Sequence, residues 1–313
     1  MKNSKSIKIF EVGPRDGLQN ELIILDPKIK IEFVNRLSKT GLKHIEVGAL
    51  VSPKWVPQMQ GSDLIFKKVT ANKLPSDKKS SKNNLSENIN YSLLVPNTKG
   101  LDMAIQCGAK EVAIFTAASE KFCKKNINCT IDESFERFEP VMKLAKQNNI
   151  KVRGYLSTVF ECPFEGPVSP DKVANLAQRL FKMGCYEVSL GDTIGVGTPN
   201  NVESLFKALK KKKLPIDKIA MHFHNTRGTA LANVLKSLDL GFRIFDSSVG
   251  GLGGCPYAPG ALGNLATEDL VYFTERMGFK TGVDLKKIIQ VHHWIQNVIG
   301  RPLASHLGRS GLA

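Results

Sequence analysis

Long apolar runs are absent from this sequence of 313 residues, since no segment reaches the ~18 consecutive apolar residues of a membrane-spanning helix. Residues 1–5 lead directly into an apolar stretch at 7–10, with neither an apolar signal core nor an arginine-rich presequence. The sequence therefore predicts no membrane segment, and we expect a cytoplasmic protein. Its hydrophobic content of 42% and charged content of 23% predict a folded globular chain with a large core.

Paired cysteine motifs are also missing, although the chain has six cysteines. None of them forms a CxxC pair or a tight framework, which indicates the reduced thiols of a cytosolic enzyme rather than a disulfide scaffold. We expect five of the six to be packing residues, namely Cys107, Cys123, Cys129, Cys162 and Cys185. Cys255 stands in a different setting, described below.

Acidic residues are fewer than basic ones. The chain has 44 lysines and arginines but only 29 aspartates and glutamates, which gives a net charge of +15. Such a charge suits nucleic acid, anionic lipid or a polyanionic substrate. The two lysine-rich runs, at 78–82 and 210–213, have no interleaved aromatic residues of the kind that single-strand binding uses. Solvated surfaces are therefore the favoured interpretation, and we expect no nucleic-acid partner. The alternative, a noncatalytic nucleic-acid-binding protein, predicts salt-sensitive binding.

Eight β-rich runs alternate with helical patterns along the chain. This alternation predicts a parallel sheet, and eight repeats predict a closed (β/α)8 TIM barrel. The expected strands are residues 7–11, 44–47, 91–95, 111–115, 151–156, 187–190, 218–223 and 243–245. Helical periodicity is clear at residues 27–38, 132–147, 170–183, 202–210 and 228–240.

Local signals support this order of elements. Ser169-Pro170 and Thr198-Pro199 are typical helix starts. Glycines that separate a helix from the next strand predict left-handed helix ends, at Gly41, Gly108, Gly184 and Gly241. Residues 70–90 are rich in serine, lysine and asparagine and predict a solvated loop. We expect a catalytic barrel over residues 1–280 and a helical extension over 281–313, with an amphipathic helix at 284–299, in one domain.

Functional side chains of a parallel barrel gather at the carboxyl ends of the strands, because the loops that follow share one rim. The first strand leads into Asp16, His222 and His224 lie at the end of the seventh, and the eighth precedes Asn264. Histidines two positions apart on a strand project to the same face. With the Asp16 carboxylate and the Asn264 amide oxygen, they form a donor set suited to Mg²⁺ or Mn²⁺.

Each part of this set also has a structural interpretation. A His-x-His pair on a strand is often structural, and an aspartate after a strand usually caps a turn. The same rim, however, also receives Arg15 and the carboxylates of Glu46 and Asp192. This convergence favours a partly open metal site with positions for substrate oxygens.

Cys255 lies in a glycine-rich loop, between Gly254 and Pro256. A lone cysteine is more often inert packing. In a loop beside the predicted metal centre, however, its pKa can be lowered, and the thiol could exchange a proton with a carbon centre. We therefore treat Cys255 as a candidate catalytic residue.

The chain resembles the 3-hydroxy-3-methylglutaryl-CoA lyase family, a group of metal-dependent barrels related to isopropylmalate and homocitrate synthases. The resemblance is carried by residues 11–21 (EVGPRDGLQNE), 51–59 (VSPKWVPQM), 124–129 (KKNINC), 189–199 (SLGDTIGVGTP) and 250–269. The GLGGCP loop at 251–256 distinguishes the lyases, because the related synthases lack its cysteine.

The resemblance implies a retro-Claisen cleavage of (S)-3-hydroxy-3-methylglutaryl-CoA to acetyl-CoA and acetoacetate. Three further implications concern individual residues: Arg15 contacts the acyl-CoA substrate, Cys255 is the catalytic thiol, and acidic residues support the site. The implied metal ligands are Asp16, His222, His224 and Asn264, and the supporting acidic positions are Glu46, Asp192 and Glu268. His222 or a metal-bound water would take the hydroxyl proton. A homodimer and a role in leucine or ketone-body metabolism are also implied.

Two segments depart from the animal members of the family. Residues 225–227 (NTR) replace an acidic residue and an aromatic residue, and residues 47–50 (VGAL) replace hydroxyl residues and a phenylalanine. These differences leave a second hypothesis open, a related aldol or Claisen lyase that acts on another 3-hydroxyacyl-CoA. Cleavage assays with several acyl-CoAs separate the two hypotheses.

Overall fold

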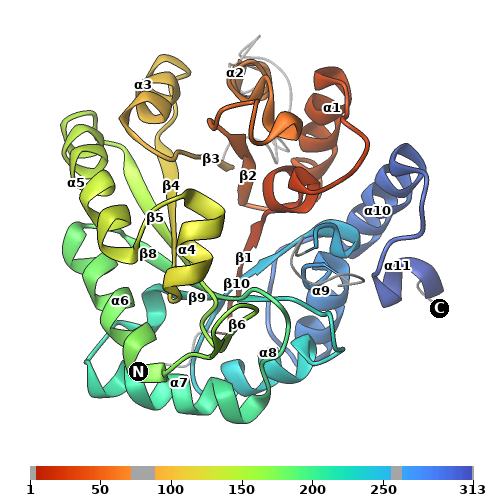
Figure 1. The fold of residues 1–313 in the computed structure, drawn as a ribbon. Coiled ribbons are helices and arrows are strands. Elements are labelled where there is room, and N and C mark those ends of the chain that lie inside the picture. The colour runs from red at the N-terminus through yellow and green to blue at the C-terminus, as the bar shows by residue number, and fades with distance from the viewer. Residues whose placement is uncertain (1–4, 72–88, 255–262, 312–313) are drawn as a thin grey trace.

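A closed barrel of parallel strands forms the centre of the computed structural model, which describes residues 5–71, 89–254 and 263–311 (Figure 1). The strands follow the order β1-β10-β9-β8-β5-β4-β3-β2 around the barrel. They are β1 (Lys8–Glu11), β2 (His44–Ala49), β3 (Asn90–Leu94), β4 (Glu111–Ala117), β5 (Lys151–Ser157), β8 (Glu187–Asp192), β9 (Ile219–Phe223) and β10 (Ile244–Ser247). The predicted (β/α)8 barrel and its eight strands are confirmed.

Helices surround this barrel (Figure 1). Those predicted from periodicity are α1 (Pro27–Leu37), α5 (Ile131–Gln147), α6 (Pro170–Met183), α7 (Pro199–Lys211), α8 (Ala230–Asp239) and α10 (Leu285–Ile299). The sequence analysis gave no range for α2 (Ser62–Ala71), α3 (Thr98–Gln106), α4 (Glu120–Ile127), α9 (Thr267–Arg276), α11 (His306–Ser310) or the small hairpin β6 (Glu161–Cys162) and β7 (Gly166–Pro167). For α3, it predicted only the helix end at Gly108. In α4, only Phe122 and Cys123 are buried, so its apolar pattern is weak.

The ends of the helices follow the predicted signals. Pro170 and Pro199 each begin a helix. The four predicted glycines all have positive φ, with 94° at Gly41, 76° at Gly108, 111° at Gly184 and 97° at Gly241. The predicted loop at 70–90 is wrong at both ends, because α2 continues to Ala71 and β3 begins at Asn90. Residues 72–88 lie outside the described residues.

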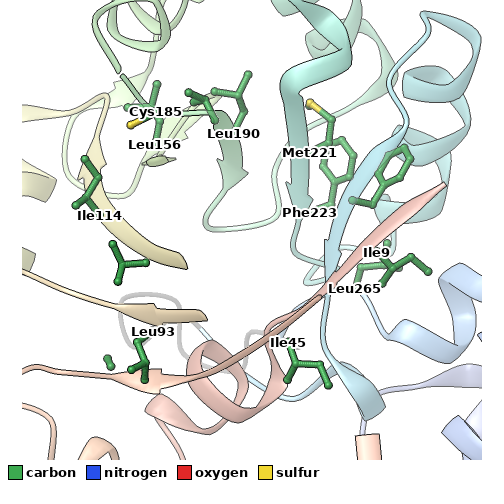
Figure 2. Packing of buried hydrophobic residues seen from close by; sticks show 14 of the residues in the cluster. Ile9, Ile45, Leu93, Ile114, Leu156, Cys185, Leu190, Met221, Phe223 and Leu265 are labelled. Atoms are coloured by element: carbon green, nitrogen blue, oxygen red, sulfur yellow. The ribbon is translucent and has the colours of Figure 1, made fainter. Parts of the chain in front are cut away.

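Successive side chains of each strand point to opposite faces of the sheet. This alternation separates an apolar layer outside the barrel from a polar barrel interior. Figure 2 shows apolar side chains that the strands contribute to the core, including Ile9, Leu190, Met221 and Phe223, all of them buried. Because Met221 and Phe223 flank His222 on β9, the histidine points to the opposite face of the strand. The apolar core thus determines which side chains of β9 face the barrel interior.

The segment after the barrel packs against α9 and α1 (Figure 1). Asp269 accepts hydrogen bonds from Ser305 Oγ and from two backbone N–H groups at the start of α11. The backbone N–H groups of Ala304 and Ser305 donate to the carbonyl oxygen of Gly250. The boundary between barrel and extension at residues 280 and 281 stays a prediction. Among the described residues, no helix combines the length and apolar character needed to cross a membrane.

Candidate metal centre and active site

Glu11, the last residue of β1, organises the backbone of the rim. Its carboxylate accepts hydrogen bonds from Gly13 N (2.9 Å), Val249 N (3.0 Å) and Thr267 Oγ1 (2.6 Å). These donors belong to the turn after β1, to the segment after β10 and to the first turn of α9. Burial raises the pKa of Glu11 to about 7. One carboxyl group therefore connects the single π-helical turn η1 (Gly13–Gly17), which carries Arg15 and Asp16, to the loops after β10.

The two histidines lie at the end of β9, and the segment after β10 brings Asn264 beside them. His222 is on β9, and His224 forms an isolated antiparallel bridge with Asn264. The imidazole centroids of His222 and His224 are 5.2 Å apart. Gly263, next to Asn264, lies so close to the chain that an added Cβ would be 1.8 Å from the Gly253 carbonyl oxygen. This close approach brings Asn264 against the glycine-rich segment at 250–253.

Asp16, His222 and His224 bring one ligand atom each within 4.8 Å of one another, an arrangement that could hold a metal ion. Asn264 extends the group, because its Nδ2 donates to Asp16 Oδ2 (2.8 Å) and to the Leu252 carbonyl oxygen (3.0 Å). These two bonds leave Asn264 Oδ1 buried and, like His224 Nδ1, without a hydrogen-bond partner within the described ranges. Buried polar atoms are rarely left unpaired, so these atoms fit a cation's ligand shell.

The electrostatics of Asp16 and His224 favour their ligand-competent forms. Burial opposes ionisation of Asp16, but Arg15 and the two histidines outweigh it and hold the pKa of Asp16 below its usual range. Burial and the neighbouring His222 lower the pKa of His224 to about 4. Near neutral pH, Asp16 is therefore a carboxylate and His224 a neutral imidazole, which are the forms that bind metal ions.

Arg15 lies beside this group and is held on several sides. Its Nη1 donates to Asp16 Oδ1 (2.7 Å), its Nε donates to Glu46 Oε2, and its guanidinium lies 5.0 Å from the centre of the Tyr155 ring. Arg15 and Glu46 are both buried. The structure thus fixes a permanent positive charge next to the candidate metal ligands.

Two other predicted acidic residues accept hydrogen bonds from backbone N–H groups. Asp192 accepts hydrogen bonds from Val196 N (3.0 Å) and Gly197 N (2.9 Å), and burial raises its pKa to about 6. Glu268 accepts a bond from Gly250 N (3.0 Å) and contacts His292 Nδ1 (2.8 Å). Glu268 therefore lies against Gly250 and α10, and neither of these two partners is a candidate metal ligand. Cys255 lies outside the described residues.

Asp246 and Glu11 were not singled out in the sequence analysis. Asp246 Oδ2 is 3.2 Å from His222 Nδ1, so it contacts a candidate ligand directly. Burial acts to raise the pKa of Asp246, but Arg153 and His222 outweigh it and keep that pKa below its ordinary value. Each acidic residue follows two apolar residues in its strand, and a charged residue at such a position was the available signal.

The fold and the site together define a class. A (β/α)8 barrel with oxygen and nitrogen donors gathered where its strands end is typical of metal-dependent barrel enzymes. The profile of the HMGL-like family matches residues 6–295. The chain belongs to the HMGL-like family, within which it matches hydroxymethylglutaryl-CoA lyases at about half of all positions.

Known relatives match nearly the whole chain. It is 50% identical over 309 residues to hydroxymethylglutaryl-CoA lyase of Pseudomonas mevalonii, covering 99% of this chain and 97% of the relative. Hydroxymethylglutaryl-CoA lyase from Pseudomonas aeruginosa has a similar crystal structure, with a TM-score of 0.90, 46% identity and coverage of 99% and 98%. An HMG-CoA lyase from Acinetobacter baumannii, in complex with coenzyme A and 3-methylmalate, has a TM-score of 0.88, 34% identity and coverage of 99% and 97%.

Proposed function

We propose that this protein is a divalent-metal-dependent lyase that cleaves (S)-3-hydroxy-3-methylglutaryl-CoA to acetyl-CoA and acetoacetate. Relatives that match nearly its full length at 46% to 50% identity have the name of this lyase. Within the structure, the observation that carries the proposal is the group of Asp16, His222 and His224 beside the unpaired Asn264 Oδ1. The solved relative with bound coenzyme A supports an acyl-CoA substrate.

The cleavage requires loss of the proton from the tertiary hydroxyl, breakage of the adjacent C–C bond and protonation of the acetyl-CoA enolate that leaves. A bound divalent cation would lower the pKa of the hydroxyl. Arg15 would stabilise the negative charge that develops on the thioester oxygen of the enolate, and its contacts with Asp16 and Glu46 hold the guanidinium in place before substrate binds. Cys255 would give its thiol proton to the enolate carbon.

The departures at 47–50 and 225–227 have structural explanations. The side chains of Val47, Ala49 and Leu50 are buried in the hydrophobic core. Arg227 Nη1 donates to the Ile194 carbonyl oxygen (2.7 Å), and Asn225 Oδ1 accepts from Ala230 N (3.2 Å). Since these residues pack the core or connect loops, they do not favour a different 3-hydroxyacyl-CoA as the substrate.

The direct test is incubation of the purified full chain with 3-hydroxy-3-methylglutaryl-CoA and Mg²⁺ while acetoacetate formation is followed. We expect turnover that a chelator abolishes and that added Mg²⁺ or Mn²⁺ restores. The same assay with other 3-hydroxyacyl-CoAs examines the second hypothesis. Faster cleavage of one of those compounds would reject the proposed substrate, and turnover unaffected by the chelator would reject the metal.

A variant with Cys255→Ala is expected to lose roughly 100- to 10,000-fold in kcat, the usual range for loss of a general acid or base. Metal affinity and the thermal midpoint should stay close to wild type, since no ligand is removed. Cys107→Ala is the matched control, because Cys107 is a free, partly exposed thiol at the end of α3, and burial raises its pKa. Full activity in Cys255→Ala would reject the thiol as proton donor.

Several finer points belong to the same proposal. The oxygen and nitrogen donors suit Mg²⁺ or Mn²⁺. A homodimer would cover some of the large apolar side chains exposed on the surface, such as Leu22 and Trp55. A cytoplasmic location and a single catalytic domain with a helical extension are likewise proposed, and the basic surface would attract the phosphates of coenzyme A.

A further inference from the structure

A buried network of charged side chains fills the barrel interior beneath the candidate metal centre. Arg153 on β5 is fully buried. It donates through Nη1 and Nη2 to the two carboxylate oxygens of Asp246 (3.2 and 2.7 Å) and through Nε to Glu187 (2.7 Å). Its guanidinium lies 4.2 Å from the centre of the Phe10 ring. These contacts leave Arg153 little freedom to move.

Asp246 connects this network to the candidate metal centre. Its Oδ2 accepts from Ser189 Oγ (2.6 Å) and is 3.2 Å from Nδ1 of His222. Because an ionised carboxylate can only accept, Nδ1 carries the proton of this bond, and the neutral ring keeps its lone pair on Nε2. That nitrogen is 3.9 Å from Asp16 Oδ2, on the side where the other candidate ligands lie.

We propose that Asp246 is a positioning residue that fixes the ring orientation and tautomer of His222, with Arg153 and Ser189 holding Asp246 in place. This inference rests on the proposed metal centre and extends it to residues outside the ligand set. Hydrogen-bonded partners of ligating histidines typically change metal affinity by about 10- to 100-fold when they are replaced. The predicted effect is therefore on metal binding first and on turnover through it.

Glu187 offers a matched control, because it is the second carboxylate bound to the same arginine. It is buried like Asp246 and accepts from Arg153 Nε and from Lys8 Nζ (2.8 Å). Among the described residues, these two cations are its side-chain partners, and neither is a candidate ligand. Neutralising either carboxylate disturbs the charge of the network, but only the change at Asp246 alters the group that faces His222.

The experiment is calorimetric titration of Mn²⁺ into the metal-free full chain, with wild type, Asp246→Asn and Glu187→Gln compared. We expect Asp246→Asn to bind Mn²⁺ roughly 10- to 100-fold more weakly than wild type. Glu187→Gln should bind with unchanged affinity. Thermal unfolding of each metal-free protein separates this effect from a loss of fold.

Equal Mn²⁺ affinity in wild type and Asp246→Asn, or equal weakening in both variants, would overturn the positioning role. A wild-type protein that binds no Mn²⁺ would instead overturn the metal centre itself, together with this inference. If Asp246→Asn does not fold, the wild type still provides a test by ¹⁵N NMR of the Mg²⁺-loaded protein. The His222 signal, assigned by its loss in His222→Gln, should show the proton on Nδ1, and a proton on Nε2 contradicts the proposal.

Discussion

Replacing Arg15 with methionine is expected to lower kcat for cleavage of 3-hydroxy-3-methylglutaryl-CoA by roughly 100- to 1,000-fold, as loss of a charge-stabilising donor usually does. Arg15 is the buried positive side chain adjacent to Asp16, and its two carboxylate contacts fix its direction. Methionine keeps much of the side-chain volume but has no charge to offer the enolate. Steady-state kinetics at saturating metal measure the loss.

The same change also removes the partner of the buried Glu46 carboxylate, so the folded state must be checked. Thermal unfolding shows whether lower activity reflects a smaller folded fraction, and Arg15→Lys tests how much a charge without the planar fork retains. Arg179→Met is the matched control, because Arg179 forms an exposed ion pair with Asp132 (2.6 Å) on the helical surface. If Arg15→Met and Arg179→Met have the same kcat, the role of Arg15 is wrong.

Metal binding should be lost almost completely when Asp16 is replaced with alanine. Asp16 supplies the only carboxylate of the three-residue group and is held below its usual pKa by Arg15 and the histidines. We expect Mn²⁺ affinity to fall by more than the about 100-fold that marks the upper range for outer partners of a metal site. His222→Ala should weaken the affinity in the same direction. Calorimetric titration measures both variants.

Thermal unfolding gives a second measurement of the same loss. In wild type, Mn²⁺ at about 100 times its Kd should stabilise the folded state by about 2.7 kcal/mol, because the ion binds only that state. At the same Mn²⁺ concentration, Asp16→Ala should gain less than about 0.4 kcal/mol, because its site is at most half saturated. Asp171→Ala, at an exposed position in the first turn of α6, should keep all of the wild-type stabilisation. Metal-dependent stabilisation that survives in full in Asp16→Ala would contradict the ligand assignment.

The sequence predicted the barrel well, because its strands and amphipathic helices repeat a local pattern that the structure retains. It also placed Asp16, His222, His224 and Asn264 on one rim, since that inference needs only the direction of parallel strands. The role of Asp246 was not predictable in this way. Its partners Ser189 and Arg153 are 57 and 93 residues away along the chain, and no local spacing connects them.

Helices were missed where burial is sparse or where glycine-rich and polar segments obscure periodicity. In α9, the first three residues, Thr267, Glu268 and Asp269, are polar yet buried. Each has a tertiary partner: Glu11 for Thr267, His292 for Glu268 and Ser305 for Asp269. Their polarity interrupts the apolar periodicity at the start of the helix, and they are buried because the fold satisfies them with hydrogen bonds.

The seam between β1 and β10 has a consequence for the order of assembly. Asp16 follows the first strand and Asn264 the last, 248 residues apart, and the two meet only when β1 pairs with β10. With the proposed ligands, an incompletely closed sheet therefore has no complete coordination sphere. A bound cation would add its binding free energy only to the closed barrel, so we expect it to slow opening of the seam without accelerating the folding steps that precede closure.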